Sequence, residues 1–158
     1  MVETMADKSF VVIAHNIRSL HNVGSIFRTG EGAGVDRVYL TGYTGTPPRK
    51  EIAKVALGSE DRVKWESNKQ IGKVVDRLKS EGYQIVALEQ DPRAISYKKF
   101  KPAQKVALIV GNEVLGVSKP LRDKADVIIE IPMLGARKSL NASVALGIAV
   151  FEIGNKLL

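Results

Sequence analysis

Five short runs of mostly β-branched and aliphatic residues recur along the chain, and a turn-like or helical stretch follows each of them. The runs cover residues 10–14, 38–40, 84–88, 106–110 and 127–131. Near-continuous apolar runs of this length are typical of parallel strands that are covered on both faces. The alternation of strand and helix therefore predicts an α/β fold in which helices flank a parallel sheet.

Helical periodicity is clearest between these runs and at the end of the sequence. Residues 22–30 and 68–80 are predicted to form helices, and the second places Ile71, Val74, Val75 and Leu78 on one stripe. The last predicted helix, residues 140–158, is apolar on nearly every side from position 142 to 151. A helix without a polar face needs partners on more than one side. We therefore expect the sheet to cover one side and a second copy of the chain, in a homodimer, to cover the other.

No internal repeat or low-complexity linker divides the chain, so residues 1–158 are predicted to form a single domain. The longest stretch without clear periodicity runs from residue 41 to residue 62. It combines glycines and prolines with the basic residues Arg49, Lys50, Lys54 and Arg62. We expect a basic loop with room for one short helix.

Composition excludes several classes of protein. The 158 residues include no cysteine and two histidines, so disulfides and thiolate metal sites are excluded and a histidine-rich metal site is not expected. The N-terminal residues MVETMADKSF lack the apolar core of a signal peptide. The longest apolar run, residues 142–151, is about half as long as a bilayer-spanning helix. The sequence therefore predicts a cytoplasmic protein without a bound metal or a membrane partner.

The formal net charge of +7 favours a polyanionic partner, because clustered Lys and Arg bind phosphates and release counterions. A basic surface can also be simply solvated, and charge alone does not separate the two alternatives. Evidence for a polyanion-binding surface over a solvated one must therefore come from the segments that could carry chemistry.

The first of these segments, residues 16–30, follows the first predicted strand. Asn22 can cap a helix whose apolar side chains point inward, which leaves Arg28 on a different face. An arginine there could grip a phosphate, although an ordinary solvated helix arginine is the alternative. The glycine-rich run 30–34 comes after a helix and before a strand, which is the reverse of the Rossmann order. We interpret it as a helix stop.

The second segment, residues 110–118, directly follows the predicted strand at 106–110 and has the sequence Val-Gly-Asn-Glu-Val-Leu-Gly-Val-Ser. Ligands of parallel sheets bind outside the carboxyl ends of strands, and glycines there let backbone N–H groups approach them. Glu113 would then lie at the cleft. The alternative is a strand-to-helix turn in which Glu113 is a carboxylate favoured by a helix dipole.

The third segment, residues 131–143, begins where the last predicted strand ends at Pro132. A flexible loop follows, and Ser139 can cap the closing helix while Asn141 lies within its first turn. Polar groups would again collect at strand ends, although capping alone would also explain Ser139.

These three segments, in this order, resemble the three motifs of the SpoU (TrmH-like) class of SPOUT RNA methyltransferases. Asn22 with Arg28 downstream matches the first motif, Gly-Asn-Glu-x-x-Gly at 111–116 the second, and Ser-Leu-Asn-x-Ser at 139–143 the third. The resemblance covers nearly the whole chain. It implies transfer of a methyl group from S-adenosylmethionine to an RNA ribose 2′-hydroxyl, and a fold with a C-terminal deep trefoil knot.

The resemblance also implies roles for individual residues. Arg28 of one subunit would serve the other subunit's site, either removing the hydroxyl proton or stabilising the developing alkoxide. The residues that would shape the catalytic cleft with it are Asn22, Glu113, Ser139 and Asn141. The methyl donor would lie among three loops and be held largely by main-chain groups. The residues at those positions are Leu88, Glu89, Val110, Gly111, Ile131, Met133, Leu134, Leu140 and Ser143.

RNA capture is expected to use Arg18, Arg49, Lys50, Lys54 and Arg62. The lysine-rich residues 98–101 could add cations, with Tyr97 or Phe100 stacking on a base, although a solvated loop is the simpler interpretation. The short sequence resembles minimal tRNA wobble-position enzymes, which favours tRNA over rRNA, whereas the first motif is closer to the general TrmH-like pattern. The alternative function is a non-catalytic basic RNA-binding protein of the same fold. A nucleotide-dependent oxidoreductase is disfavoured because no phosphate loop follows the first strand.

Overall fold

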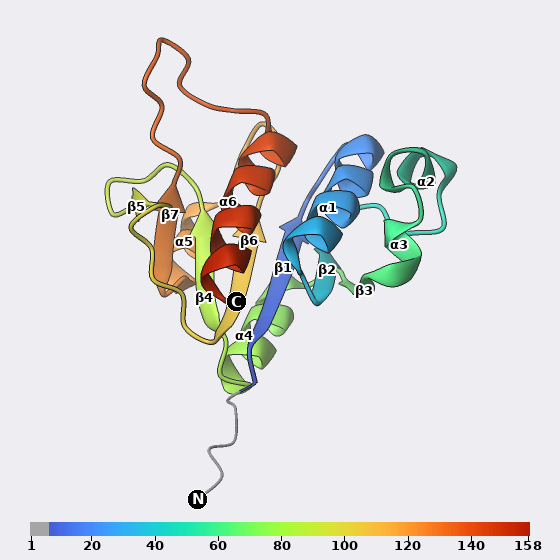
Figure 1. Ribbon diagram of the computed structural model, residues 1–158, viewed down its shortest axis with the longest axis horizontal. Coiled ribbons are helices and arrows are strands. Elements are labelled where there is room, and N and C mark those ends of the chain that lie inside the picture. Colours follow the sequence, from blue (N-terminus) through green and yellow to red (C-terminus); the bar gives the residue numbers. More distant parts are fainter. Residues whose placement is uncertain (1–6) are drawn as a thin grey trace, which may run out of the picture.

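The computed structural model describes residues 7–158, so the expectation about a signal peptide falls mostly outside the described residues. Over this range the chain forms a seven-stranded sheet in the order β3-β2-β1-β6-β4-β7-β5, and every pairing in it is parallel. Helices lie on both faces of the sheet (Figure 1). The prediction of a parallel sheet flanked by helices is confirmed.

Five strands lie where the apolar runs predict them, and two edge strands were missed. The strands are β1 (Ser9–His15), β2 (Arg37–Thr41), β3 (Lys64–Asn68), β4 (Gln84–Leu88), β5 (Ile95–Ser96), β6 (Lys105–Val110) and β7 (Val127–Glu130). The missed strands, β3 and β5, are the two ends of the sheet. Neither is buried on both faces, and so neither needs a continuous apolar run.

The three predicted helices are present, with shifted ends. The helices are α1 (Leu20–Ala33), α2 (Lys50–Ala56), α3 (Ser59–Arg62), α4 (Ile71–Ser80), α5 (Lys119–Lys124) and α6 (Ala142–Lys156). The expected basic loop at 41–62 therefore contains two short helices rather than one. Helix α1 ends where Gly34 adopts a φ of 82°, which confirms that the glycine-rich run stops the helix.

Two-sided burial explains the continuous apolar runs. In β1, Phe10 and Val12 belong to the core that α1 and α6 cover, whereas Val11 and Ile13 belong to the core that α4 and α5 cover. Figure 1 shows α1 and α6 side by side in front of the sheet and α4 and α5 behind it. Each fully buried Val, Ile or Phe side chain stabilises the folded state by about 1.5–3 kcal/mol relative to the same side chain left exposed.

Two helix caps differ from the prediction. Ser19, rather than Asn22, caps α1 and accepts the backbone N–H of Asn22 at 3.1 Å. Asn141, rather than Ser139, caps α6, and its Oδ1 accepts the backbone N–H of Ser143 at 2.9 Å. Ser and Asn are about equally good N-caps, so the residue type alone does not decide at which of them the helix begins. Because Ser19 and Asn141 are the caps, the side chains of Asn22 and Ser139 are available for other contacts.

Residues 131–141 form a long loop between β7 and α6, and most of the loop is exposed. In Figure 1 the loop extends beyond the carboxyl-terminal ends of the strands. The trefoil knot that the resemblance implies would involve this region, and it stays a prediction.

Neither a membrane-spanning helix nor a metal site is found among residues 7–158. None of the helices in that range is both long enough and apolar enough to cross a bilayer. Within the same residues, no three His, Asp or Glu side chains come together as ligands of a metal ion would.

Candidate active site

A pocket of about 380 Å³ lies at the carboxyl ends of β4, β6 and β7. Strand β4 lies between the other two in the sheet. Sites for small ligands occupy roughly 300–1,000 Å³, and in parallel sheets they lie at the ends where this pocket is found. The pocket is therefore the candidate active site.

Most of the predicted cofactor-binding residues line this pocket. Those that do are Leu88, Glu89, Val110, Gly111, Ile131, Met133 and Leu140. Leu134 and Ser143 are not among the lining residues. The Leu134 side chain is 98% exposed on the long loop, and the Ser143 hydroxyl donates a hydrogen bond to Asn141 at 2.7 Å.

Sequence reasoning missed several lining residues, among them Gln90, Arg122, Glu130 and Ala145. Gln90 and Glu130 lie at the carboxyl ends of β4 and β7, so their position in the predicted sheet could have identified them. Arg122 comes from α5, a helix of six residues, and no local pattern marks it.

A tight turn at residues 111–117 forms one wall of the pocket. The N–H of Gly116 donates to the carbonyl of Asn112 at 2.9 Å, and the Asn112 Oδ1 accepts the N–H groups of Val114 and Leu115, also at 2.9 Å. A Cβ on Gly111 would overlap the Gly116 carbonyl. Glycine is therefore required at position 111 for the turn to close.

Glu89 holds the far end of this turn. Its Oε2 accepts the N–H of Val117 at 2.9 Å, and its Oε1 accepts the N–H of Gln90 at 2.8 Å. A Cβ on Gly116, where φ is 66°, would overlap the same carboxylate. Glu89 is thus part of the framework of the turn as well as of the pocket wall.

Arg122 supports the turn from α5. Its Nε donates to Asp91 Oδ2 at 2.9 Å and its Nη1 to the Val117 carbonyl at 2.5 Å. Hydrogen bonds from Arg93 first, and then from Arg122, hold the pKa of Asp91 well below its usual range. The Asp91 side chain is 5% exposed and stays ionised, so this support persists throughout the neutral pH range.

Glu113 connects the pocket to the start of α1. Its carboxylate accepts the backbone N–H groups of Arg18 at 2.9 Å and Ser19 at 2.8 Å, and the Asn22 Nδ2 at 3.0 Å. Partial burial opposes ionisation, but these hydrogen bonds outweigh it and lower the pKa of Glu113. Glu113 lines the pocket, as the first interpretation expects. The helix N-terminus that it contacts is that of α1 and not that of α5, the helix that follows its own turn. A carboxylate that is held in its charged form is a poor general base. The hydrogen bonds of Glu113 suit it instead to holding the start of α1 in place beside the pocket.

Replacing Glu113 with Gln should lower stability by about 1–2 kcal/mol at neutral pH, because the amide cannot accept all three donors. The folded-state pKa of Glu113 is below the unfolded value of about 4.3. Its carboxylate therefore stabilises the fold above that pH, and the stabilisation is lost as the pH falls through the folded-state pKa. Urea unfolding of both proteins between about pH 7 and pH 3 should show the stability difference shrinking on acidification. A difference independent of pH would contradict this interpretation.

The structure brings together some, but not all, of the predicted catalytic residues. Ser139 and Glu113 line the pocket, and the buried Asn22, which is 9% exposed, donates a hydrogen bond to Glu113. Asn141 lies beside them as the cap of α6. Arg28 is exposed on α1 and is not among the lining residues of its own chain's pocket.

The basic residues predicted to capture RNA are all exposed. Arg18 follows β1 directly, and its backbone is held by the pocket residue Glu113. Arg49, Lys50 and Lys54 belong to α2 or precede it. Helix α2 packs against α1. Arg62 differs from the others because its Nε and Nη2 donate to Glu31 at 2.7 and 3.1 Å, an ion pair that neutralises part of its charge.

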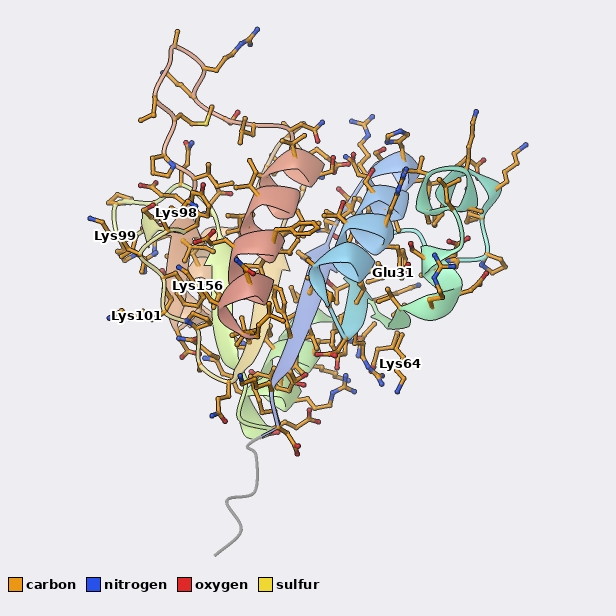
Figure 2. All side chains as sticks on the ribbon, in the orientation of Figure 1. Glu31, Lys64, Lys98, Lys99, Lys101 and Lys156 are labelled. Atoms are coloured by element: carbon orange, nitrogen blue, oxygen red, sulfur yellow. The ribbon has the colours of Figure 1, made fainter. Side chains whose placement is uncertain are left out.

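The lysine-rich residues 98–101 lie on the opposite side of the molecule from α2. Figure 2 shows Lys98, Lys99 and Lys101 around β5, far from Glu31 and Lys64. The expectation that Phe100 could stack on a base is wrong, because its side chain is 2% exposed in the core. The Lys156 Nζ donates to the carbonyls of Lys98 at 2.8 Å and Phe100 at 2.7 Å, which ties this loop to α6.

A parallel sheet with a pocket at the carboxyl ends of three adjacent strands, walled by a glycine-dependent turn, is typical of α/β proteins that bind a small molecule beside the sheet. Residues 9–151 match the SpoU rRNA Methylase family. The chain belongs to this family.

Individual relatives agree with the family match. The chain is 34% identical over 158 residues to the Staphylococcus haemolyticus protein named "Putative TrmH family tRNA/rRNA methyltransferase". The alignment covers 98% of this chain and 63% of that protein. The chain spans about six-tenths of the length of the curated relatives it matches.

Two solved structures have nearly the same fold over this chain. The A. aeolicus TrmH/SpoU tRNA modifying enzyme superposes with a TM-score of 0.85 at 32% identity, covering 95% of this chain and 76% of that one. The AdoMet-bound rRNA methyltransferase from Sinorhizobium meliloti superposes with a TM-score of 0.88 at 28% identity, covering 97% of this chain and 58% of that one. The parallel sheet and its flanking helices are thus those of SPOUT methyltransferases.

Proposed function

We propose that the protein transfers a methyl group from S-adenosylmethionine to a ribose 2′-hydroxyl of RNA, with tRNA favoured over rRNA. One observation carries the proposal: three motif segments that are far apart in the sequence meet at one small pocket. Glu113 and Ser139 line the pocket, and Asn22 donates a hydrogen bond to Glu113. The AdoMet-bound S. meliloti protein supports the cofactor, and the A. aeolicus tRNA modifying enzyme supports a tRNA substrate.

The residues of the pocket suit S-adenosylmethionine. Glycine at position 111 lets the two ends of the turn at 111–117 pack against each other, because a Cβ there would overlap the Gly116 carbonyl. Three carboxylates, those of Glu89, Glu113 and Glu130, lie in the lining and favour a cationic sulfonium over an anionic ligand. Leu88, Ile131 and Leu140 add apolar surface. When bound, the cofactor would supply an electrophilic methyl group.

The chain's own contribution is orientation and electrostatic stabilisation. A ribose hydroxyl is a weak nucleophile near neutral pH and must lose its proton while it is held in line with the methyl group. Glu113 is committed to hydrogen bonds with α1 and is not free to accept that proton. An arginine side chain normally carries its proton and is a poor base, so we assign Arg28 to stabilising the developing alkoxide and the neighbouring phosphate. The proton of the hydroxyl then passes to solvent water as the bond from oxygen to the methyl group forms.

A homodimer would bring Arg28 to the pocket of the partner subunit. Helix α6 buries one side against the sheet and leaves Val144 and Phe151 each 51% exposed on the other; Leu158, two residues after the helix, is 93% exposed. A groove of about 650 Å³ lies between this side of α6 and the end of α1, the helix that carries Arg28. A second copy of the chain would bury this apolar surface, and it is the occupant that we propose.

Replacing Phe151 with Glu should shift the protein from dimer to monomer, because a charge would be buried at the interface without a partner. The expected loss of transfer activity is at least tenfold, and the far-UV circular dichroism should stay unchanged. Light scattering after gel filtration measures the mass. Lys73→Glu on α4, where the side chain is exposed on the other face of the sheet, introduces the same residue away from the interface and is the matched control. A fully active monomeric variant would contradict the role of the dimer.

The activity is tested by incubating the purified protein with labelled S-adenosylmethionine and unmodified tRNA or rRNA, followed by mass spectrometry of the nucleosides. We expect 2′-O-methylated nucleosides, with tRNA preferred. Methylation on a base would overturn the assignment to ribose, and transfer to rRNA alone would overturn the tRNA preference. RNA binding without affinity for S-adenosylmethionine would instead identify a non-catalytic RNA-binding protein.

A further inference from the structure

Tyr43 is an exposed aromatic residue at the rim of the pocket. Its surface is 62% exposed, although its hydroxyl accepts a hydrogen bond from the Asn112 Nδ2 at 2.8 Å. Asn112 is a lining residue of the pocket, and its Nδ2 also donates to the Asn16 carbonyl at 2.9 Å. One end of the tyrosine side chain is thus fixed to the pocket wall while most of its surface faces solvent.

The loop that carries Tyr43 is held firmly. The Tyr43 N–H donates to the Asn16 Oδ1 at 3.1 Å. The next residue, Thr44, is 6% exposed, and its hydroxyl accepts the N–H of Ile17 at 3.0 Å and donates to the Thr41 carbonyl at 2.8 Å. These bonds join the ends of β1 and β2. A ring that is fixed before a ligand arrives loses little conformational entropy on binding.

A cation lies on the neighbouring loop, which follows β1 and is bonded to the Tyr43 loop. Arg18 comes directly after Ile17, its backbone N–H binds the pocket residue Glu113, and its side chain is exposed. An aromatic surface and a cation beside one pocket match the two parts of a nucleotide, since a base stacks on the ring and a phosphate binds the guanidinium. Packing in the core does not explain Tyr43, because most of its surface is exposed.

We propose that Tyr43 is a stacking platform for an unpaired base of the RNA at the rim of the pocket. The proposal rests on the proposed function only in taking RNA as the substrate. Every base has a flat aromatic face, so the platform holds the RNA beside the pocket without selecting its sequence. Tyr43 binds the nucleotide but takes no part in the transfer of the methyl group.

Three variants separate stacking from a structural role of the hydroxyl. Tyr43→Phe keeps the ring and loses the bond to Asn112, Tyr43→Leu keeps apolar bulk, and Tyr43→Ala removes both. Fluorescence anisotropy with a labelled unmodified tRNA transcript should show affinity roughly tenfold weaker for the Ala and Leu variants and near wild type for Phe. Calorimetric affinity for S-adenosylmethionine should be the same in all four proteins.

A second probe tests the base directly. Wild type should bind a single-stranded RNA of about ten nucleotides more tightly than an abasic strand of equal length, and Tyr43→Ala should lose this preference. The salt dependence of binding should not change, because no phosphate contact is removed. Equal RNA affinity of wild type and Tyr43→Ala would overturn the platform, as would a Phe variant as weak as the Ala variant. Loss of RNA binding in Tyr43→Ala when wild type transfers no methyl group would support the platform and overturn only the proposed function.

Discussion

Replacing Arg28 with alanine is expected to reduce methyl transfer by about 10²- to 10³-fold, the range seen when a group that stabilises developing charge is removed. Affinity for S-adenosylmethionine should stay unchanged, because the role proposed for Arg28 is at the ribose oxygen and the neighbouring phosphate of the RNA, and not at the cofactor. Nucleoside mass spectrometry measures the first quantity and calorimetry the second. Arg77→Ala on α4, across the sheet from α1, is the matched control and should keep full activity.

Mixed dimers test whether Arg28 acts across the subunit interface. One subunit carries Arg28→Ala with an intact pocket, and the other carries an intact Arg28 with a pocket closed by Gly116→Val. If the arginine serves the partner's pocket, the mixture regains activity at one site of each mixed dimer, although each parent is inactive. An inactive mixture with confirmed mixed dimers would place Arg28 in its own subunit's site and contradict the proposed arrangement.

Arg28→Lys distinguishes charge from geometry. Lysine keeps the positive charge but lacks the planar fork that binds an oxygen pair on a phosphate. We expect activity between those of Arg28→Ala and wild type. Full activity of the lysine variant would mean that a point charge is sufficient, and the role assigned to the guanidinium fork would be wrong.

Local periodicity was enough to predict the central strands but not the edges of the sheet. The strands β1, β4 and β6 are buried on both faces, so their sequences are continuously apolar and easily identified. Strand β3 is exposed along one edge, and its sequence Lys-Trp-Glu-Ser-Asn has no such signature. Helix ends were predicted to within a few residues, because several adjacent polar residues could each serve as the cap.

The site was predictable as three segments but not as a network of contacts. The bonds from Arg18, Ser19 and Asn22 to Glu113 join residues more than ninety positions apart, and such contacts leave no periodic pattern in the sequence. The same holds for Tyr43, whose importance depends on its bond to a distant asparagine. Family resemblance supplied the identity of the motif residues, and the folded chain shows that the Glu113 carboxylate is bonded to the residues at the start of α1.

Replacing Gly111 with alanine should weaken the binding of S-adenosylmethionine by about 100-fold. The added Cβ would overlap the carbonyl of Gly116 and lie 2.7 Å from the Val117 nitrogen. Both are backbone atoms in a turn that Glu89 holds at Val117, so neither can move aside as a flexible side chain would. Overpacking of this kind lowers the free energy of unfolding by about 1–3 kcal/mol. If the turn opened to relieve the overlap, the backbone groups proposed to hold the cofactor would move away from it.

Calorimetry with S-adenosylmethionine should show affinity about 100-fold weaker for Gly111→Ala, and urea unfolding should show a lower free energy of unfolding. Gly135→Ala is the matched control, because its added Cβ has no heavy atom within 4 Å and its backbone is not left-handed. That variant should be as stable as wild type or more stable by up to about 1 kcal/mol, since alanine restricts the unfolded chain. Wild-type affinity in Gly111→Ala would mean that the turn at 111–117 is not the wall against which the cofactor binds.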